Sequence, residues 1–283
     1  MIDAYANNTG TGDATVNIVN SGDLVISASA DAESTRNSAY AYATITEAIQ
    51  MTASADNGNA TVSLINNGTI TISAEADAVA NTYAYAYASV ETGIGQYARA
   101  TGGNAYAEII NAPAMSILAD AFASGNSATA TATVSMGISQ SVSAFGGSAT
   151  ALLDNNDPLT ISANAVANAD VNDAYARAYV DTGIYQDVYA TGTTGGAAGL
   201  GFGARALIVN GATGDVAISA NADAVGVTFA SASATVHTGI YQSAQATAGS
   251  ATASIDNAGA LFVGAAASAT ADTAASAFAS VSY

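Results

Sequence analysis

The chain of 283 residues has no cysteine, no tryptophan and no lysine, and only two prolines. Without cysteine it has no disulfide framework. Four arginines stand against 22 acidic residues, which gives a formal net charge of −18. This balance argues against nucleic acid partners, because neutralising phosphates requires basic side chains, and against anionic membrane surfaces. No apolar stretch approaches the roughly 18 residues of a membrane span, so no membrane insertion is expected. Residues 1–6 lack the basic and apolar regions of a signal peptide.

Groups for acid–base or nucleophilic catalysis are equally scarce. His237 is the only histidine, and it aligns with Glu91, Ser135 and Asp181 in other copies of the repeat described below. A column filled by four different residue types is typical of a solvated turn. We therefore predict that the protein is not an enzyme and needs no cofactor.

Carboxylates are the only groups that point to a metal. Asp154 and Asp157 form the densest set, and Asp170 and Asp173 form another pair. Neither pair matches the spacing of an EF-hand or of the nonapeptide calcium repeat. Two interpretations stay open: the acids keep a repetitive β protein soluble, or these four residues bind calcium at turns.

The residues that are present form an internal repeat of about 45 residues, clearest over 58–102. An asparagine turn precedes each apolar strand, at Asn20, Asn66, Asn111, Asn155, Asn210 and Asn257. A Gly-Ile-x-Gln motif ends at Gln96, Gln140, Gln186 and Gln242, with a shortened copy ending at Gln50. Neighbouring glutamines lie 46, 44, 46 and 56 residues apart, and the long interval holds a Gly-rich insertion near 192–203. The spacing indicates about six repeats.

Within each repeat the apolar residues alternate with polar ones, as at Ala84, Ala86 and Ala88 against Tyr85 and Tyr87. This period of two predicts strands with one inward and one outward face. Alanine dominates the inward positions, so the core must be thin, with two walls close together. We predict an all-β fold: one continuous flattened, two-walled β-solenoid domain over 1–283.

Each repeat also divides into two similar halves, each a strand, a glycine and a second strand. Taking each half as one coil predicts about twelve coils, and at about 4.8 Å per coil a rod of roughly 58 Å. Stacked coils place equivalent residues above one another, so amides form hydrogen-bonded ladders and tyrosine rings stack. The candidates for hydrogen-bonded ladders are the six turn asparagines and Gln50, Gln96, Gln140, Gln186 and Gln242. The candidates for stacked rings are Tyr40 with Tyr85, and Tyr42 with Tyr87.

Two families resemble these patterns. The Asn-x-Gly-x-Ile/Leu step at 20–24, 66–70 and 257–261 resembles repeats of β-helical autotransporter passengers and filamentous adhesins. The stretch from Gln96 through Gly102 to Asn111 is similar to curlin repeats of bacterial amyloid fibres, which have about 22 residues per coil. Both resemblances imply a secreted structural protein at or outside the cell surface.

We therefore expect a subunit of an extracellular bacterial fibre, in a biofilm matrix or in surface adhesion, whose partner is a second copy of the chain. The alternatives are a monomeric adhesin passenger that binds a glycan or a protein, and an ice-binding solenoid. The sequence ends in mid-coil and begins where that coil would continue, which predicts head-to-tail contacts. The residues expected at that contact are Met1, Ile2, Ala4, Tyr5 and Ala6 at one end and Ala279, Val281 and Tyr283 at the other.

Overall fold

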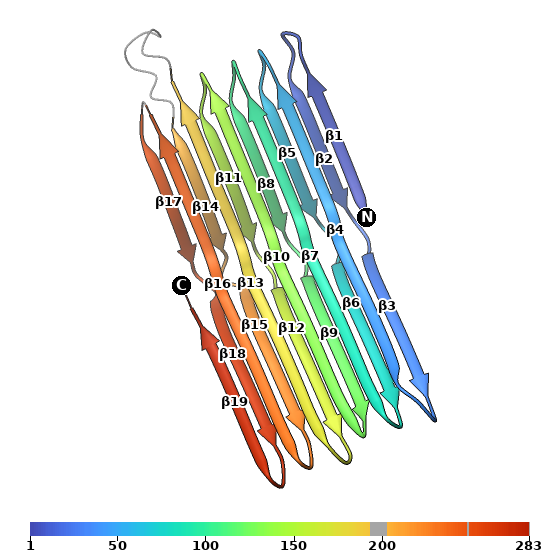
Figure 1. Ribbon diagram of the computed structural model, residues 1–283. Coiled ribbons are helices and arrows are strands. Elements are labelled where there is room, and N and C mark those ends of the chain that lie inside the picture. Colours follow the sequence, from blue (N-terminus) through green and yellow to red (C-terminus); the bar gives the residue numbers. More distant parts are fainter. Residues whose placement is uncertain (193–202, 248, 283) are drawn as a thin grey trace.

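The computed structural model describes residues 1–192, 203–247 and 249–282. All of the regular structure in this part of the chain is β-strand, in three parallel sheets (Figure 1), which confirms the all-β fold class. No helix in this part is long and apolar enough to cross a membrane. The Gly-rich insertion expected near 192–203 lies, apart from its two end residues, outside the described residues, and so does Tyr283.

Sheet A contains the long strands and runs the length of the molecule. Its order is β1 (Ile2–Asn8), β4 (Ala39–Ala55), β7 (Tyr83–Ala100), β10 (Ser127–Phe145), β13 (Asp173–Thr191), β16 (Phe229–Ala246) and β19 (Ala274–Val281). Sheet B contains short strands: β2 (Ala14–Asn20), β5 (Ala60–Asn66), β8 (Ala105–Asn111), β11 (Ala149–Asn155), β14 (Ala204–Asn210) and β17 (Ala251–Asn257). Sheet C contains β3 (Leu24–Ser34), β6 (Ile70–Ala80), β9 (Met115–Gly125), β12 (Leu159–Ala169), β15 (Asp215–Val225) and β18 (Ala260–Thr270).

Each coil passes once through all three sheets. The chain runs along a strand of sheet B, continues into sheet C, and then turns back along one long strand of sheet A (Figure 1). Sheet A therefore forms one wall, and sheets B and C, end to end, form the other, since strands of B and of C both pack against those of A. The result is a flattened two-walled solenoid, as the alternating pattern predicts.

The number of coils differs from the sequence-based expectation. Strand pairing steps by a whole repeat, as in Ala60 with Ala105 and Ile72 with Ile117. One repeat of about 45 residues is thus one coil, and the expectation of two coils per repeat, about twelve in all, is wrong. The seven strands of sheet A span six spacings, or roughly 29 Å rather than 58 Å. An 18-residue strand such as β7 is about 60 Å long, so the molecule is a plate rather than a rod.

The glycine that suggested a turn in mid-repeat has another role. Gly93 lies inside the continuous strand β7, and it has no positive φ. A Cβ atom added there would lie 2.7 Å from Ile117 Cδ1 on the facing sheet C. The same contact recurs between Gly137 and Ile161, and between Gly183 and Ile218. Glycine therefore lets an inward isoleucine of sheet C lie against the backbone of sheet A.

The core between the walls consists mainly of stacked alanines. In sheet A the column of Ala86 continues through Ala130, Ala176 and Ala232, all at most 1% exposed. Buried isoleucine, leucine and valine side chains fill the rest of the space between the two walls. This confirms the thin alanine-rich core that the composition predicts. No peptide bond among the described residues is cis.

Candidate functional site

The turn asparagines form a continuous column of side-chain hydrogen bonds at the end of sheet B. The Nδ2 group of each donates to Oδ1 of the next, over 2.7 to 2.9 Å, and the column runs through Asn20, Asn66, Asn111, Asn155, Asn210 and Asn257. Every donated bond points toward the C-terminal end of the solenoid. The ladder therefore has a direction, which sequence reasoning did not anticipate.

These amides also stabilise the turn that connects each strand of sheet B to the next strand of sheet C. Asn20 Nδ2 donates a second bond to the carbonyl of Thr69, and Asn210 Nδ2 donates to that of Ala260. Three of the asparagines, in β5, β8 and β11, are fully buried. A buried amide is stable only when its donors and acceptor are paired, so the column ties successive turns together.

The glutamines form a second column inside the solenoid, on sheet A. Gln140 Nε2 donates to Gln96 Oε1 at 2.8 Å, and the next two steps toward Gln242 measure 2.7 Å. Each glutamine also reaches across to sheet B, as Gln96 does to the carbonyl of Glu108 at 2.8 Å. These side chains therefore bridge the two walls. Their bonds point toward the N-terminal end, opposite to the asparagine column.

Gln50 is not part of this column, and its expected place in a ladder is wrong. The structure pairs Gln50 with Gly95, while Met51 occupies the register of Gln96. The shortened motif lacks the residue between isoleucine and glutamine, so Gln50 falls on the outward face. Its Oε1 atom lies where a Cβ of Gly95 would be. At the N-terminal end of the column, where a further glutamine would accept from Gln96, the structure has a long contact of 3.8 Å from Gln96 Nε2 to Met51 Sδ.

The tyrosine pairs expected to stack lie side by side on sheet A but do not stack. Tyr40 pairs with Tyr85 and Tyr42 with Tyr87, each with ring centroids 6.4 Å apart and tilted planes. Tyr185 and Tyr241 do stack, with centroids 5.1 Å apart and planes 8° from parallel.

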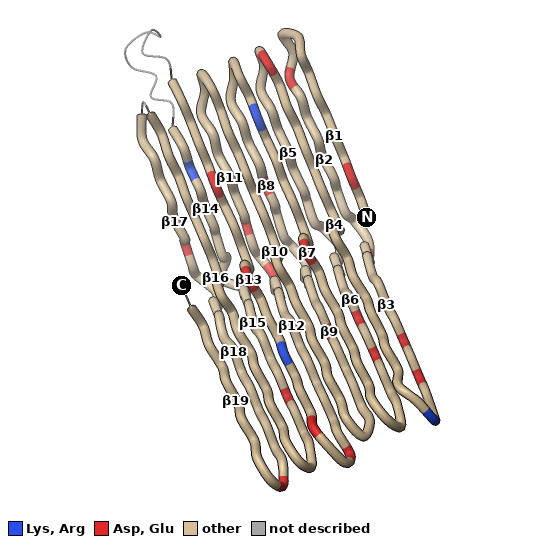
Figure 2. Tube along the Cα trace, in the orientation of Figure 1, with Lys and Arg blue, Asp and Glu red and all other residues tan. Residues whose placement is uncertain are grey.

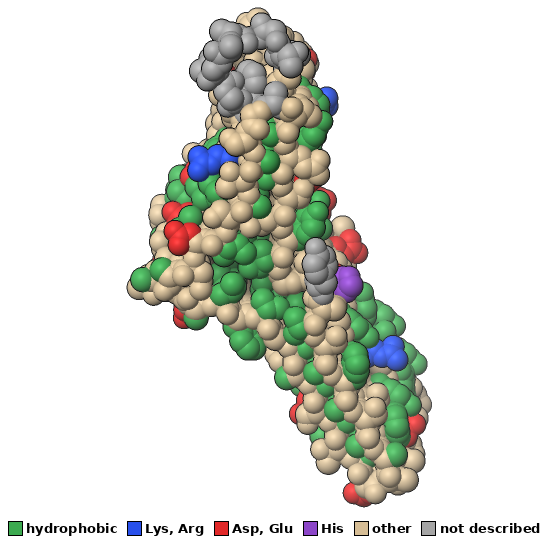
Figure 3. Space-filling model, turned by 90° about the vertical axis from the view of Figure 1, so that its left-hand side faces the viewer, with side chains coloured by type: hydrophobic (Ala, Val, Ile, Leu, Met, Phe, Trp, Pro, Cys, Tyr) green, Lys and Arg blue, Asp and Glu red, His purple; other side chains and the backbone are tan. Residues whose placement is uncertain are grey.

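The two ends of the solenoid present open strand edges. β1 pairs with only the second half of β4, over 49–55, and β19 pairs with only the first half of β16, over 229–236. The segments 39–45 of β4 and 240–246 of β16 are thus left with one free edge each. Viewed onto the C-terminal edge, hydrophobic side chains lie exposed between the walls (Figure 3), and Ile255 is 44% exposed.

The residues expected at the subunit contact lie on these edges. Ile2, Ala4 and Ala6 are the inward residues of β1 and Tyr5 is an outward one, while Met1 precedes the strand. Ala279 and Val281 continue the inward columns of β16, opposite Ala234 and Val236. No hydrogen-bond partner for Asn257 Nδ2 is present in the described part of the chain.

The four metal candidates do not form a cluster. Asp154 Oδ1 accepts a hydrogen bond from Asn156 Nδ2, Asp157 lies in the following turn, and Asp170 and Asp173 flank the turn before β13. Among the described residues no group of three or more ionisable ligands is placed to hold a metal ion. Charged residues are thinly spread over the solenoid, several of them at turns (Figure 2).

The carboxylate of Asp77, on the outer face of sheet C, lies near two other acidic side chains. Partial burial, followed by the Asp31 and Glu75 carboxylates, raises the pKa of Asp77. Asp77 Oδ1 is buried and has no hydrogen-bond partner within the described structure. The ionised form of this residue is therefore disfavoured in the folded state.

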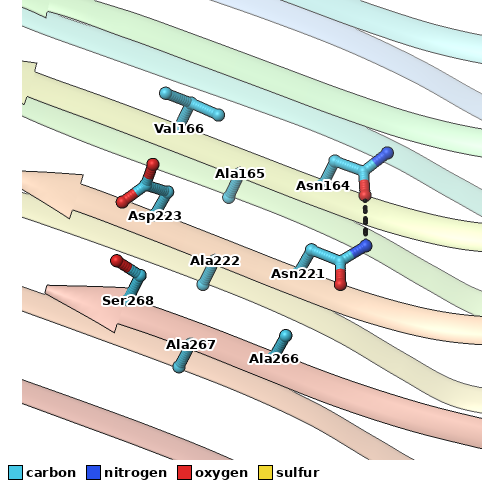
Figure 4. A pocket seen from close by; sticks show the side chains of 9 residues that line it. All are labelled: Asn164, Ala165, Val166, Asn221, Ala222, Asp223, Ala266, Ala267 and Ser268. Carbon is cyan, nitrogen blue, oxygen red and sulfur yellow. Dashed lines mark hydrogen bonds between the residues drawn. The ribbon is translucent and has the colours of Figure 1, made fainter.

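A shallow hollow of about 390 Å³ lies farther along the same face (Figure 4). Small residues of β12, β15 and β18 leave this space, and Asn221 Nδ2 donates to Asn164 Oδ1 at its side. Its lining includes one ionisable residue, Asp223. This hollow therefore supplies no pair of groups for acid–base chemistry.

The features that distinguish the molecule are thus the asparagine column, which runs from one open edge to the other, and the glutamine column, which runs from Gln242 to Gln96 inside the solenoid. The expected columns could be read from the repeat, whereas their opposite directions and the half-length strands at each end have no signal in the sequence pattern. Comparison of the chain with protein-family models, with curated proteins and with solved structures gives no significant match.

Proposed function

We propose that the protein is a structural subunit of an extracellular fibre, in which copies stack head to tail through their solenoid ends. The observation that carries this proposal is the complementarity of the two open edges. Unpaired strand edges bind further strands readily, and a contact between two different edges does not close on itself. Repeated stacking of this kind gives a filament.

The aliphatic columns of sheet A continue across such a junction, whereas the glutamine column stops there, because Ala4 of the second copy follows Gln242. If the register of sheet A is extended, Ile2 of a second copy follows Ile240, and Ala6 of that copy follows Ala244. The half-strand β1 of the second copy fills the free half of β16, and β19 fills the free half of β4 in that copy. Two half-strands thereby complete one full-length strand of sheet A, and the exposed apolar residues between the walls become buried.

The direction of the asparagine column favours this orientation. Among the described residues, the C-terminal edge ends in the unpaired donor of Asn257. At the N-terminal edge, Asn20 Oδ1 accepts from within that part of the chain only a long 3.4 Å contact from the Gly22 amide. Head-to-tail stacking brings donor to acceptor. Stacking of two C-terminal edges against each other breaks every column, because the strands then meet antiparallel.

The extracellular setting rests on the resemblance to curlin repeats and autotransporter passengers. The absence of cysteine and the acidic, repetitive surface are compatible with it. The 45-residue coil differs from the 22-residue coil that the curlin resemblance implied, so it is the stacking of parallel coils, not curlin-type coil size, that supports a fibre.

The test uses two variants, each with one disabled edge. Asn257→Asp keeps an acceptor for Asn210 but places a carboxylate against Asn20 of the next copy. Ile2→Asp places a charge in the apolar part of the opposite edge, where an unpaired charge is strongly unfavourable. Light scattering and electron microscopy should show filaments for the unaltered chain and monomers of 27.5 kDa for each variant alone.

An equimolar mixture of the two variants should form only dimers, since one intact C-terminal edge meets one intact N-terminal edge. A chain that stays monomeric at high concentration without any substitution would refute the fibre proposal. Dimers formed by either variant alone would show that like edges pair, and would refute the head-to-tail arrangement.

A further inference from the structure

Twelve of the 14 tyrosines lie on the outward face of sheet A, where they alternate with buried residues. They are Tyr5, Tyr40, Tyr42, Tyr83, Tyr85, Tyr87, Tyr97, Tyr175, Tyr179, Tyr185, Tyr189 and Tyr241. We call this surface the tyrosine face. It belongs to one wall of the solenoid, and three of its members, Tyr5, Tyr40 and Tyr42, lie at the N-terminal open edge.

The densest part of the tyrosine face covers two neighbouring strands, β4 and β7. The rings of Tyr42 and Tyr85 lie 5.5 Å apart between centroids, and those of Tyr40 and Tyr83 lie 6.0 Å apart. Tyr83 Oη donates to Thr129 Oγ1 on β10 at 3.2 Å. Tyr40 and Tyr42 remain 54% and 60% exposed, so their rings are open to a ligand.

On this part of the surface β4, β7 and β10 carry no charge, while Arg177 of the next strand, β13, lies close enough to interact with Tyr85. Residues 39–46, 83–90 and 127–145 include no acidic or basic side chain, although the chain as a whole has a net charge of −18. Their outward positions hold tyrosine, threonine and serine. A large uncharged aromatic patch on an acidic molecule marks an interaction site, and its chemistry is that of ring faces surrounded by hydroxyl groups.

The fold does not require aromatic residues at these positions. The register of Tyr40 passes through Tyr85, Thr129, Tyr175 and Ser231. Threonine and serine thus occupy the same strand position in other coils, facing the same solvent. An aromatic ring at these positions is therefore not a requirement of the fold.

We propose that the tyrosine face binds a neutral polysaccharide. The exposed rings would stack on the apolar faces of sugar rings, and the tyrosine, threonine and serine hydroxyls would bond the sugar hydroxyls. Because the sheet is rigid, little conformational freedom is lost on binding. An anionic polysaccharide is disfavoured by the net charge, and so is a second copy of the chain laid face to face, since both copies carry the same charge.

Affinity electrophoresis tests this on the Ile2→Asp variant, whose disabled edge removes filaments from the gel. The probes are hydroxyethyl cellulose, xyloglucan and mannan as neutral polysaccharides, with alginate as the anionic control. The combined substitution Tyr40→Ser and Tyr42→Ser introduces residues that occur in the same register in β16, Ser231 and Ser233. Phe262→Ser is the matched control, since it removes an exposed aromatic ring from sheet C.

We expect at least one neutral polysaccharide, but not alginate, to retard the parent chain. The double tyrosine substitution should weaken this binding about tenfold or more, as two aromatic contacts are lost, and Phe262→Ser should leave it unchanged. Absence of retardation by all three probes, equal retardation by alginate, or an equal effect of Phe262→Ser would overturn the proposal. Lateral dimers of the parent that the double substitution abolishes would instead assign the face to self-association. The outcome does not depend on fibre formation, because the chain tested is monomeric by design.

Discussion

The buried asparagine column gives a sharp test of what holds successive coils together. In Asn111→Asp the side chain keeps its shape but loses both donors, one to Asn155 Oδ1 at 2.7 Å and one to the carbonyl of Asp157 at 3.3 Å. Asn111 is fully buried, so the new carboxylate faces an amide oxygen without water. Leaving a buried charge uncompensated costs about 3–5 kcal/mol, part of which is recovered because Asn66 still donates to it.

We therefore expect the free energy of unfolding at pH 7 to fall by about 3 kcal/mol or more. Urea unfolding followed by circular dichroism, with linear extrapolation to water, measures this change. Burial raises the folded-state pKa of the new carboxyl above its unfolded value of about 3.9. The destabilisation is thus complete above the folded-state pKa and disappears below the unfolded-state pKa, where the protonated group is again a donor.

Asn257→Asp is the control for this experiment, because its carboxylate still accepts the bond from Asn210 and lies on an exposed edge. The loss there should stay below about 1 kcal/mol. Both variants are compared in the Ile2→Asp background, so that filaments do not contribute. An effect of Asn111→Asp no larger than that of Asn257→Asp would refute the idea that the column stabilises the interior of the stack.

Four further outcomes follow from the packing and the charges. Ala86→Leu should lower the melting temperature, since overpacking costs about 1–3 kcal/mol, whereas Thr61→Val on an outward position should not; equal effects would contradict the assignment of faces. Gly93→Ala should also destabilise, because its Cβ would lie 2.6 Å from the carbonyl oxygen of Gly137 and 2.7 Å from Ile117 Cδ1; Ile117→Ala should reduce the penalty in part, since the carbonyl stays in place, and no rescue at all would show that the isoleucine is not an obstacle. The raised pKa of Asp77 means that its contribution to stability is greatest below the unfolded-state value of 3.8 and is lost as the pH rises through the folded-state pKa. Asp77→Asn should therefore raise the melting temperature at neutral pH and not in strong acid, and a rise at both would point to another cause. EDTA should leave the melting temperature unchanged, and a drop that calcium restores would establish a calcium site.

Much of the architecture is predictable because it depends on local alternation. A period of two decides which side chains of a strand share a face, so the inward alanines and the outward tyrosines follow from the residues alone. The repeat then aligns equivalent positions, and the structure places the six turn asparagines in one column. Gln50 shows the limit of this reasoning, since a motif one residue shorter moves its glutamine to the opposite face.

The sequence by itself determined the strand faces, the alanine core and the repeat, because these depend on side-chain alternation and on spacing along one chain. Only the tertiary structure decided the size of a coil. Glycine in Thr92-Gly93-Ile94 is compatible with a turn or with a close approach of two walls, and the contact with Ile117 selects the second. The direction of each amide column was likewise decided by the fold, because an amide side chain donates at one end and accepts at the other, and only its neighbours in the stack determine which way it points.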